Sequence, residues 1–167
     1  MKTLYSTPAE VGDAIKAELK RKFPGVDFTL RNGTGWAHNN FFHVCWHDGP
    51  AFNAVYKVVY KYKHSWHMKE THVVAEDGEI MKLGGVNSVH CDRYYSSELR
   101  DKCRAVAEAA GLLDPSNDPH NAGAKKIFSQ MLHYSDLRGV STPSLEFDEA
   151  NRTWVFVAAA SARPSGV

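Results

Sequence analysis

Residues 40–67 change their hydrophobic period once, and this change constrains the fold more than any other feature of the chain. Phe42, Val44 and Trp46 alternate with more polar neighbours, a period of two that is typical of a strand with one buried face. The turn signal Asp48-Gly49-Pro50 follows, and proline presets the backbone angle of a first helical turn. Apolar residues then recur at helical spacing, at Phe52, Val55, Tyr56 and Val59. The segment therefore predicts a strand, a turn and a helix over residues 50–63.

Helix and strand patterns of the same kind lie on both sides of this segment. Thr7-Pro8-Ala9-Glu10 predicts a capped helix that ends at Pro24-Gly25. Further strands are predicted at 26–31, 71–74, 79–81, 86–94, 145–147 and 154–156, with helices before Gly111 and after Pro119. Helices and strands do not alternate regularly, so the predicted class is α+β. We expect a mostly antiparallel sheet of roughly four to six strands with helices packed on one face, plus a C-terminal helix and hairpin.

Residues 113–119 are the most linker-like stretch inside the chain, because Asp, Asn, Ser and Pro gather there. We therefore expect an α+β domain over residues 1–112. Residues 113–167 would form a helix–hairpin extension packed on the same core.

The composition excludes several classes of protein. Of the 167 residues, 43% are hydrophobic and 23% are charged, as in ordinary globular proteins. No apolar run approaches the roughly 20 residues that span a bilayer, and the N-terminus has no signal-peptide pattern. The three cysteines are widely spaced and odd in number, which suits a reducing compartment. We expect a cytoplasmic protein without a membrane partner, and its net charge of +1 gives no overall attraction to nucleic acid.

Three metal-ligating residue types share one face of the strand at 40–47, at His43, Cys45 and His47. Side chains two residues apart on a strand are about 6.6 Å apart, and a tetrahedral zinc ion accepts nitrogen and sulfur ligands. The alternative is a solvated polar face, which we favour because no Cys-x-x-Cys or His-Glu-x-x-His motif accompanies the triplet. We therefore expect no cofactor, with zinc as the metal that the triplet would suit. His90 and Cys91 point to opposite faces, so they predict no nucleophilic pair.

Aromatic and basic residues interleave over residues 56–69. The side chains predicted to contact a partner or nucleic acid are Lys57, Tyr60, Lys61, Lys63, His64 and His67. Cations of this kind contact phosphates while rings stack on unpaired bases, and the same surface would serve an acidic protein. The alternative is a solvated helix face with half-buried tyrosines.

Several of these motifs resemble one known family. Residues 14–26, the following Phe28-Thr29-Leu30-Arg31, and Val44-x-Trp46-x-Asp48-Gly49-Pro50 resemble the large polyvalent protein-associated domain of type 29, and the segment around residues 89–96 is similar to it as well. The resemblance covers roughly residues 9–111. It implies a phage or conjugative-element protein acting inside a bacterial host cell, and it carries over no catalytic residues.

This setting favours one function and leaves two alternatives. The first is an accessory protein of a phage or mobile element that binds a host protein or nucleoprotein complex without catalysis, inhibiting a defence system such as CRISPR-Cas or restriction. A free-standing chain of this size would fit such a dedicated anti-defence protein. The second is a metal-dependent enzyme acting on nucleic acid, and the third is a salt-sensitive single-stranded nucleic-acid-binding module.

Overall fold

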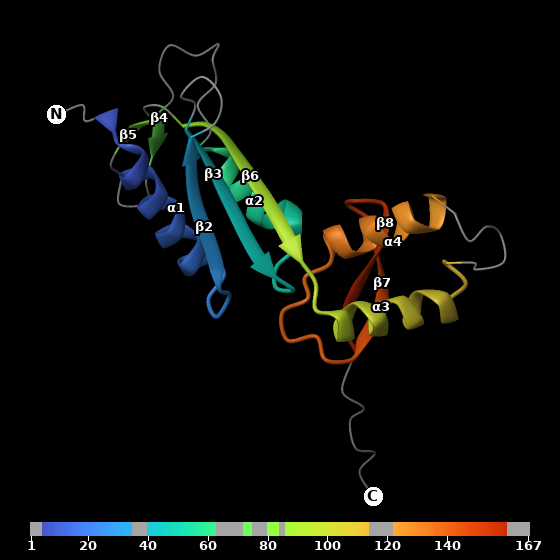
Figure 1. Cartoon of the computed structure of the whole chain (residues 1–167). Helices are drawn as coiled ribbons and strands as arrows, with labels where there is room; N and C mark the ends of the chain where they lie inside the picture. Colours follow the sequence, from blue (N-terminus) through green and yellow to red (C-terminus); the bar gives the residue numbers. More distant parts are fainter. Residues whose placement is uncertain are drawn as a thin grey trace, which may run out of the picture. The chain divides into compact units, whose positions relative to one another are not determined.

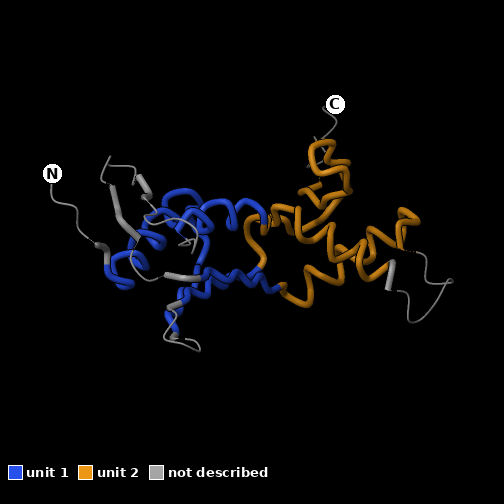
Figure 2. The backbone as a smooth tube through the Cα atoms, turned by 90° about the horizontal axis from the view of Figure 1, so that it is seen from above, with its two compact units in different colours: residues 1–47, 53–94 blue, residues 48–52, 95–167 orange. Residues whose placement is uncertain are grey.

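The computed structural model describes residues 5–34, 40–62, 72–74, 80–83, 86–113 and 122–159 (Figure 1). Backbone contacts divide the chain into two compact units, shown in different colours in Figure 2. The first unit comprises residues 1–47 and 53–94, and the second comprises residues 48–52 and 95–167.

The described residues of the first unit form two three-stranded sheets and two helices. Its elements in chain order are β1 (Tyr5–Ser6), α1 (Pro8–Lys22), β2 (Phe28–Thr34), β3 (Asn40–His47), α2 (Phe52–Tyr60, in this unit from Asn53 on), β4 (His72–Val74), β5 (Ile80–Leu83) and β6 (Val86–Tyr94). One sheet has the order β2-β3-β6, with β3 antiparallel to β2 and parallel to β6. The other has the order β1-β5-β4, with β5 parallel to β1 and antiparallel to β4.

Local sequence explains how α1 starts and which side of it is buried. The Thr7 hydroxyl accepts a hydrogen bond from the Glu10 amide while the Glu10 carboxylate accepts one from the Thr7 amide, which forms the predicted capping box. Gly12 lets the helix approach the sheet, since a Cβ there would lie 3.1 Å from the Phe42 ring. Phe42 is 2% exposed, so α1 covers the apolar face of the β2-β3-β6 sheet.

The second unit packs two helices on a hairpin. It contains α3 (Ser97–Ala109), α4 (Ala122–Tyr134), β7 (Pro143–Asp148) and β8 (Thr153–Ala158), and β7 and β8 pair antiparallel. Its buried core is formed by Cys103, Ala107, Leu113, Phe128, Met131, Leu132, Leu137, Val140 and Phe156. Ser135 links the end of α4 to β8, because its buried hydroxyl donates to the Met131 carbonyl and accepts from the Phe156 amide.

The α+β class is confirmed, and the C-terminal helix and hairpin are present as α4, β7 and β8. Each sheet has fewer strands than we expected. The predicted burial of Phe42, Val44 and Trp46 is also confirmed, at 2%, 0% and 1% exposure. The division at residue 112 stays a prediction, because a compact unit and a domain need not share their boundaries.

The helix after Pro50 differs from its prediction in length and in rotation. It spans Phe52–Tyr60 rather than residues 50–63. Its buried residues are Val55, Val58 and Val59, whereas Tyr56, which we placed on the apolar stripe, is 37% exposed. The helix therefore turns its valines to the core and leaves Tyr56 at the edge of that core.

Candidate functional sites

The β2-β3-β6 sheet has a polar face opposite the one that α1 covers. On β3 this face carries His43, Cys45 and His47, because the alternate residues of the strand are buried. The parallel register with β6 places His90 beside His43 and Asp92 beside Cys45. Two strands that are distant in the sequence thus bring chemically active side chains to one face.

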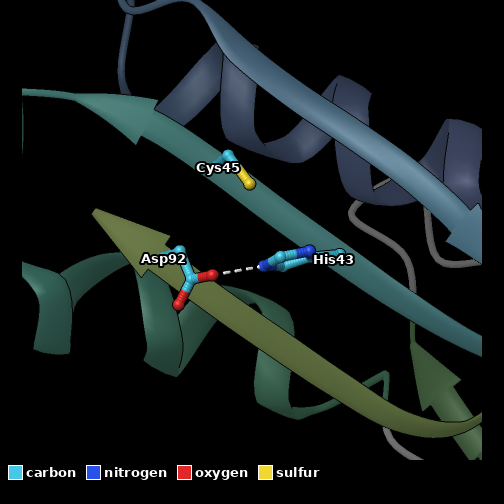
Figure 3. A group of neighbouring side chains, drawn as sticks. All are labelled: His43, Cys45 and Asp92. Carbon is cyan, nitrogen blue, oxygen red and sulfur yellow. Dashed lines mark hydrogen bonds and ion pairs between the residues drawn. The ribbon is translucent and has the colours of Figure 1, made fainter. Parts of the chain in front are cut away.

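Three of these side chains point toward one another (Figure 3). A ligand atom from each of His43, Cys45 and Asp92 lies within 4.8 Å of the others. His43 Nε2 and Asp92 Oδ2 are 2.6 Å apart, a hydrogen bond between side chains that are 31% and 54% exposed. We call these three residues the donor group.

His47 and His90 lie on the same face with aromatic neighbours. The His47 ring stacks on the Tyr94 ring, with ring centroids 5.3 Å apart. The His90 and Phe41 rings make a T-shaped contact, with ring centroids 6.0 Å apart. Neither histidine belongs to the donor group. The side chains whose ligand atoms gather within 4.8 Å are thus those of His43, Cys45 and Asp92, while His47, which the sequence suggested as a ligand, lies outside this group.

The Cys91 thiol has a different environment from that of Cys45. Burial, together with the nearby Asp92 carboxylate and Cys45, raises the pKa of Cys91 to about 12. A thiol with such a pKa stays protonated at neutral pH and is neither a nucleophile nor a ready metal ligand. Cys91 is therefore a structural rather than a reactive cysteine.

The exposed side of α2 carries a pair of tyrosines with a lysine between them in the sequence. Tyr56 and Tyr60 are 37% and 49% exposed, and their ring centroids are 5.1 Å apart. Lys57 is exposed beside them. We call Tyr56, Lys57 and Tyr60 the α2 surface.

Lys61 has a partner inside its own unit. Its Nζ lies 2.6 Å from Oε2 of Glu18, a carboxylate on α1 that is only 7% exposed, and the same oxygen accepts a hydrogen bond of 2.8 Å from the Tyr62 hydroxyl. The second Glu18 oxygen lies 3.3 Å from Lys22 Nζ. Burial raises the pKa of Glu18, but hydrogen bonds from Lys61, Tyr62 and Lys22 and the charge of Lys61 outweigh it, so the pKa lies below its usual value. The charge of Lys61 is thus compensated within the chain.

The other predicted contact residues, Lys63, His64 and His67, lie outside the described residues. Of the predicted set, the structure therefore brings Lys57 and Tyr60 together on an exposed face and turns Lys61 toward Glu18.

Comparison with known protein families identifies the family of this chain. The model of large polyvalent protein associated domain 29 matches residues 6–96, more than half of the sequence. The chain belongs to this family. No curated protein and no solved structure matches it.

The match places both candidate sites inside the domain 29 region. The donor group and the α2 surface fall within residues 6–96, whereas α3, α4, β7 and β8 follow it. Membership associates the chain with the polyvalent proteins of phages. Among the described residues, no helix is long and apolar enough to cross a bilayer.

Sequence reasoning missed Asp92 and Glu18. The alternation of residues 86–94 indicates that Asp92 shares a face with His90, but nothing local indicates that this strand pairs with β3 or in which register. A signal for Glu18 was present: it follows Val11 and Ile15 at helical spacing on the apolar stripe of α1. A carboxylate on such a stripe indicates a buried ionic partner.

Proposed function

We propose that this chain is a non-catalytic accessory protein of a phage or mobile element, and that its α2 surface binds a host protein. The single observation that supports this is the exposed pair Tyr56 and Tyr60 beside Lys57. Tyrosine is enriched among the residues that contribute most to protein interfaces, because its ring is large, rigid and amphipathic.

Charge favours a protein partner over bare nucleic acid. Binding to a phosphate backbone needs several uncompensated cations. Among the described residues of the predicted basic row, Lys61 pairs with Glu18 and Lys57 remains as the cation of the α2 surface. The tyrosine rings also lie against each other rather than apart, so they do not form an open slot for a base.

The family suggests what such binding achieves. Membership of domain 29 implies a mobile element acting inside a bacterial cell, and a small binding protein in that setting can disarm a defence system such as CRISPR-Cas or restriction. The proposed function is therefore inhibition of a host defence complex through contact with one of its proteins.

The test uses the full chain as bait in host lysate, with and without nuclease treatment. We expect one host protein or complex to be retained at similar levels after nuclease treatment. The double variant Lys57→Glu/Tyr60→Ala should lose it, and the control Lys125→Glu, which reverses an exposed charge on α4, should keep it. If the retained material disappears with nuclease, or survives the double variant, the α2 surface is not the protein-binding site.

The inhibitory role has its own measurement. Cells with an active defence system and cells without it are challenged with a targeted phage while they express the chain. We expect wild type and Lys125→Glu to raise plating efficiency only in defended cells, and Lys57→Glu/Tyr60→Ala to give no increase. No increase with wild type in any defended strain would contradict an anti-defence role while leaving the binding result untouched.

A metal-dependent enzyme acting on nucleic acid is the second candidate. The donor group is the observation that favours it, because three protein ligands with an open fourth position are typical of catalytic zinc. Zinc-loaded protein incubated with single-stranded and duplex DNA and RNA should show turnover that Asp92→Asn abolishes. Intact substrates would exclude this activity.

A further inference from the structure

We propose that His43, Cys45 and Asp92 form a zinc-binding site on the polar face of the β2-β3-β6 sheet. This inference does not rest on the proposed binding function. The three side chains supply an imidazole nitrogen, a thiolate sulfur and a carboxylate oxygen, which are the ligand types that Zn(II) combines in proteins.

The spacing of the donor atoms suits a tetrahedral ion. Metal–ligand bonds of about 2.0–2.3 Å in a tetrahedron place neighbouring ligand atoms about 3.3–3.8 Å apart. The three ligand atoms all lie within 4.8 Å of one another, and His43 Nε2 is 2.6 Å from Asp92 Oδ2. Small side-chain rotations would create the site. They would lengthen the distance from His43 Nε2 to Asp92 Oδ2 and shorten those distances between ligand atoms that exceed the tetrahedral spacing.

The backbone already holds the three residues in place. His43 and Cys45 are two residues apart on β3, so their side chains leave the same face. Asp92 is the direct partner of Cys45 in the parallel ladder with β6. A donor on each strand means that the metal would bridge β3 and β6 by side chains as well as by backbone hydrogen bonds.

Two other interpretations of these residues explain less. A hydrogen bond between His43 and Asp92 alone gives no reason for a thiol to lie within reach of both. A Cys45 nucleophile activated by His43 would need a hydrogen bond between them, and the structure records none in the part of the chain that it describes.

The donor group would leave a fourth coordination position open. Three protein ligands bind tetrahedral zinc with water, or a donor from another molecule, as the fourth. His43 and Asp92 are 31% and 54% exposed, so solvent reaches this position. Zinc binds the thiolate form of cysteine and the neutral form of histidine, so binding should weaken as the pH falls.

The first experiment measures binding by the untagged full chain after chelator treatment. Zinc titration against a chromophoric chelator should give one ion per chain. Cobalt(II) used as a probe should produce absorption bands of tetrahedral cobalt and a thiolate-to-cobalt charge-transfer band, which Cys45→Ser removes. Absence of stoichiometric zinc, or cobalt spectra of an octahedral ion without thiolate, would overturn the proposal.

Matched variants on the same sheet face identify the ligands. Asp92→Asn and His43→Gln should each weaken zinc binding by at least about 100-fold, since even residues outside the ligand shell change metal affinity by about 10–100-fold. His47→Gln and His90→Gln should leave the affinity within about twofold of wild type, because neither side chain belongs to the donor group. Loss of binding in His47→Gln with retention in Asp92→Asn would refute the site. Circular dichroism of each apo variant checks that the fold is unchanged.

Discussion

The buried carboxylate of Glu18 allows a quantitative test of how α2 is held against α1. This carboxylate is 7% exposed and pairs with Lys61 at 2.6 Å, with a further hydrogen bond from Tyr62. The substitution Lys61→Met keeps the aliphatic stem and removes the ammonium group. Glu18 then remains buried with Tyr62 and the more distant Lys22 at 3.3 Å.

The expected destabilisation follows from the degree of burial. Removing one partner of a fully buried ion pair costs about 3–5 kcal/mol. Lys61 is 35% exposed, and two partners of Glu18 remain, so screening and the remaining contacts reduce this loss. We expect the free energy of unfolding to fall by about 1–2 kcal/mol at pH 7. The same substitution at Lys16, whose surface pair with Asp13 spans 3.6 Å, should cost at most about 0.5 kcal/mol.

The pH dependence has a definite sign. The folded-state pKa of Glu18 is lowered, so the unfolded chain takes up its proton first as the pH falls. The stability from this carboxylate is therefore present above the ordinary value of 4.5 and is lost as the pH falls through the folded-state pKa. The difference in the free energy of unfolding between wild type and Lys61→Met should be constant from pH 7 to about 5 and should shrink below about 4.5.

Urea unfolding, monitored by tryptophan fluorescence, measures the free energy of unfolding of wild type and each variant. A Trp154→Phe background removes the tryptophan of the second unit, so the signal of buried Trp46 on β3 reports on the first unit. An equal loss in Lys61→Met and Lys16→Met would refute the reasoning, as would a difference that does not change between pH 7 and pH 4. Either result would mean that Glu18 gains no stability from Lys61.

Three further substitutions or reactions test the packing and the chemistry. Cys91, with a pKa of about 12, should resist alkylation at pH 8 in the folded chain and react after denaturation, as measured by peptide mass spectrometry; equal rates in both states would contradict its burial. Gly12→Val should reduce the stability of the first unit by about 1–3 kcal/mol in urea unfolding, because its side chain would overlap the Phe42 ring; no loss would show that α1 can shift freely. Ser135→Ala should lower the free energy of unfolding by about 1–3 kcal/mol in thermal unfolding, because it leaves the buried Phe156 amide without its acceptor. Ser135→Thr, which keeps a hydroxyl, should retain part of this stability.

Features that depend on neighbouring residues could be predicted from the sequence. The capping box of α1 needs only Thr7 and Glu10, which are three residues apart. The burial of alternate residues in β3 follows from the period of two, and the α+β class follows from the order of these patterns. The family resemblance rests on the same local motifs, and the match over residues 6–96 confirms it.

Features that depend on strand pairing could not be predicted. Asp92 reaches His43 and Cys45 because β6 pairs parallel with β3 in one register, and a shift by one residue would turn Asp92 to the other face. Lys61 and Glu18 are 43 positions apart and meet only when α2 packs beside α1. The rotation of α2 is likewise set by packing, which buries Val58 and leaves Tyr56 exposed.

Hydrophobic period and capping act over a few residues, so local patterns were enough to predict most helices and strands of this protein and the buried face of β3. Which polar groups meet depends on strand register and helix packing, and no local pattern encodes these contacts between distant segments. The donor group and the pairing of Lys61 with Glu18 are both of this second kind.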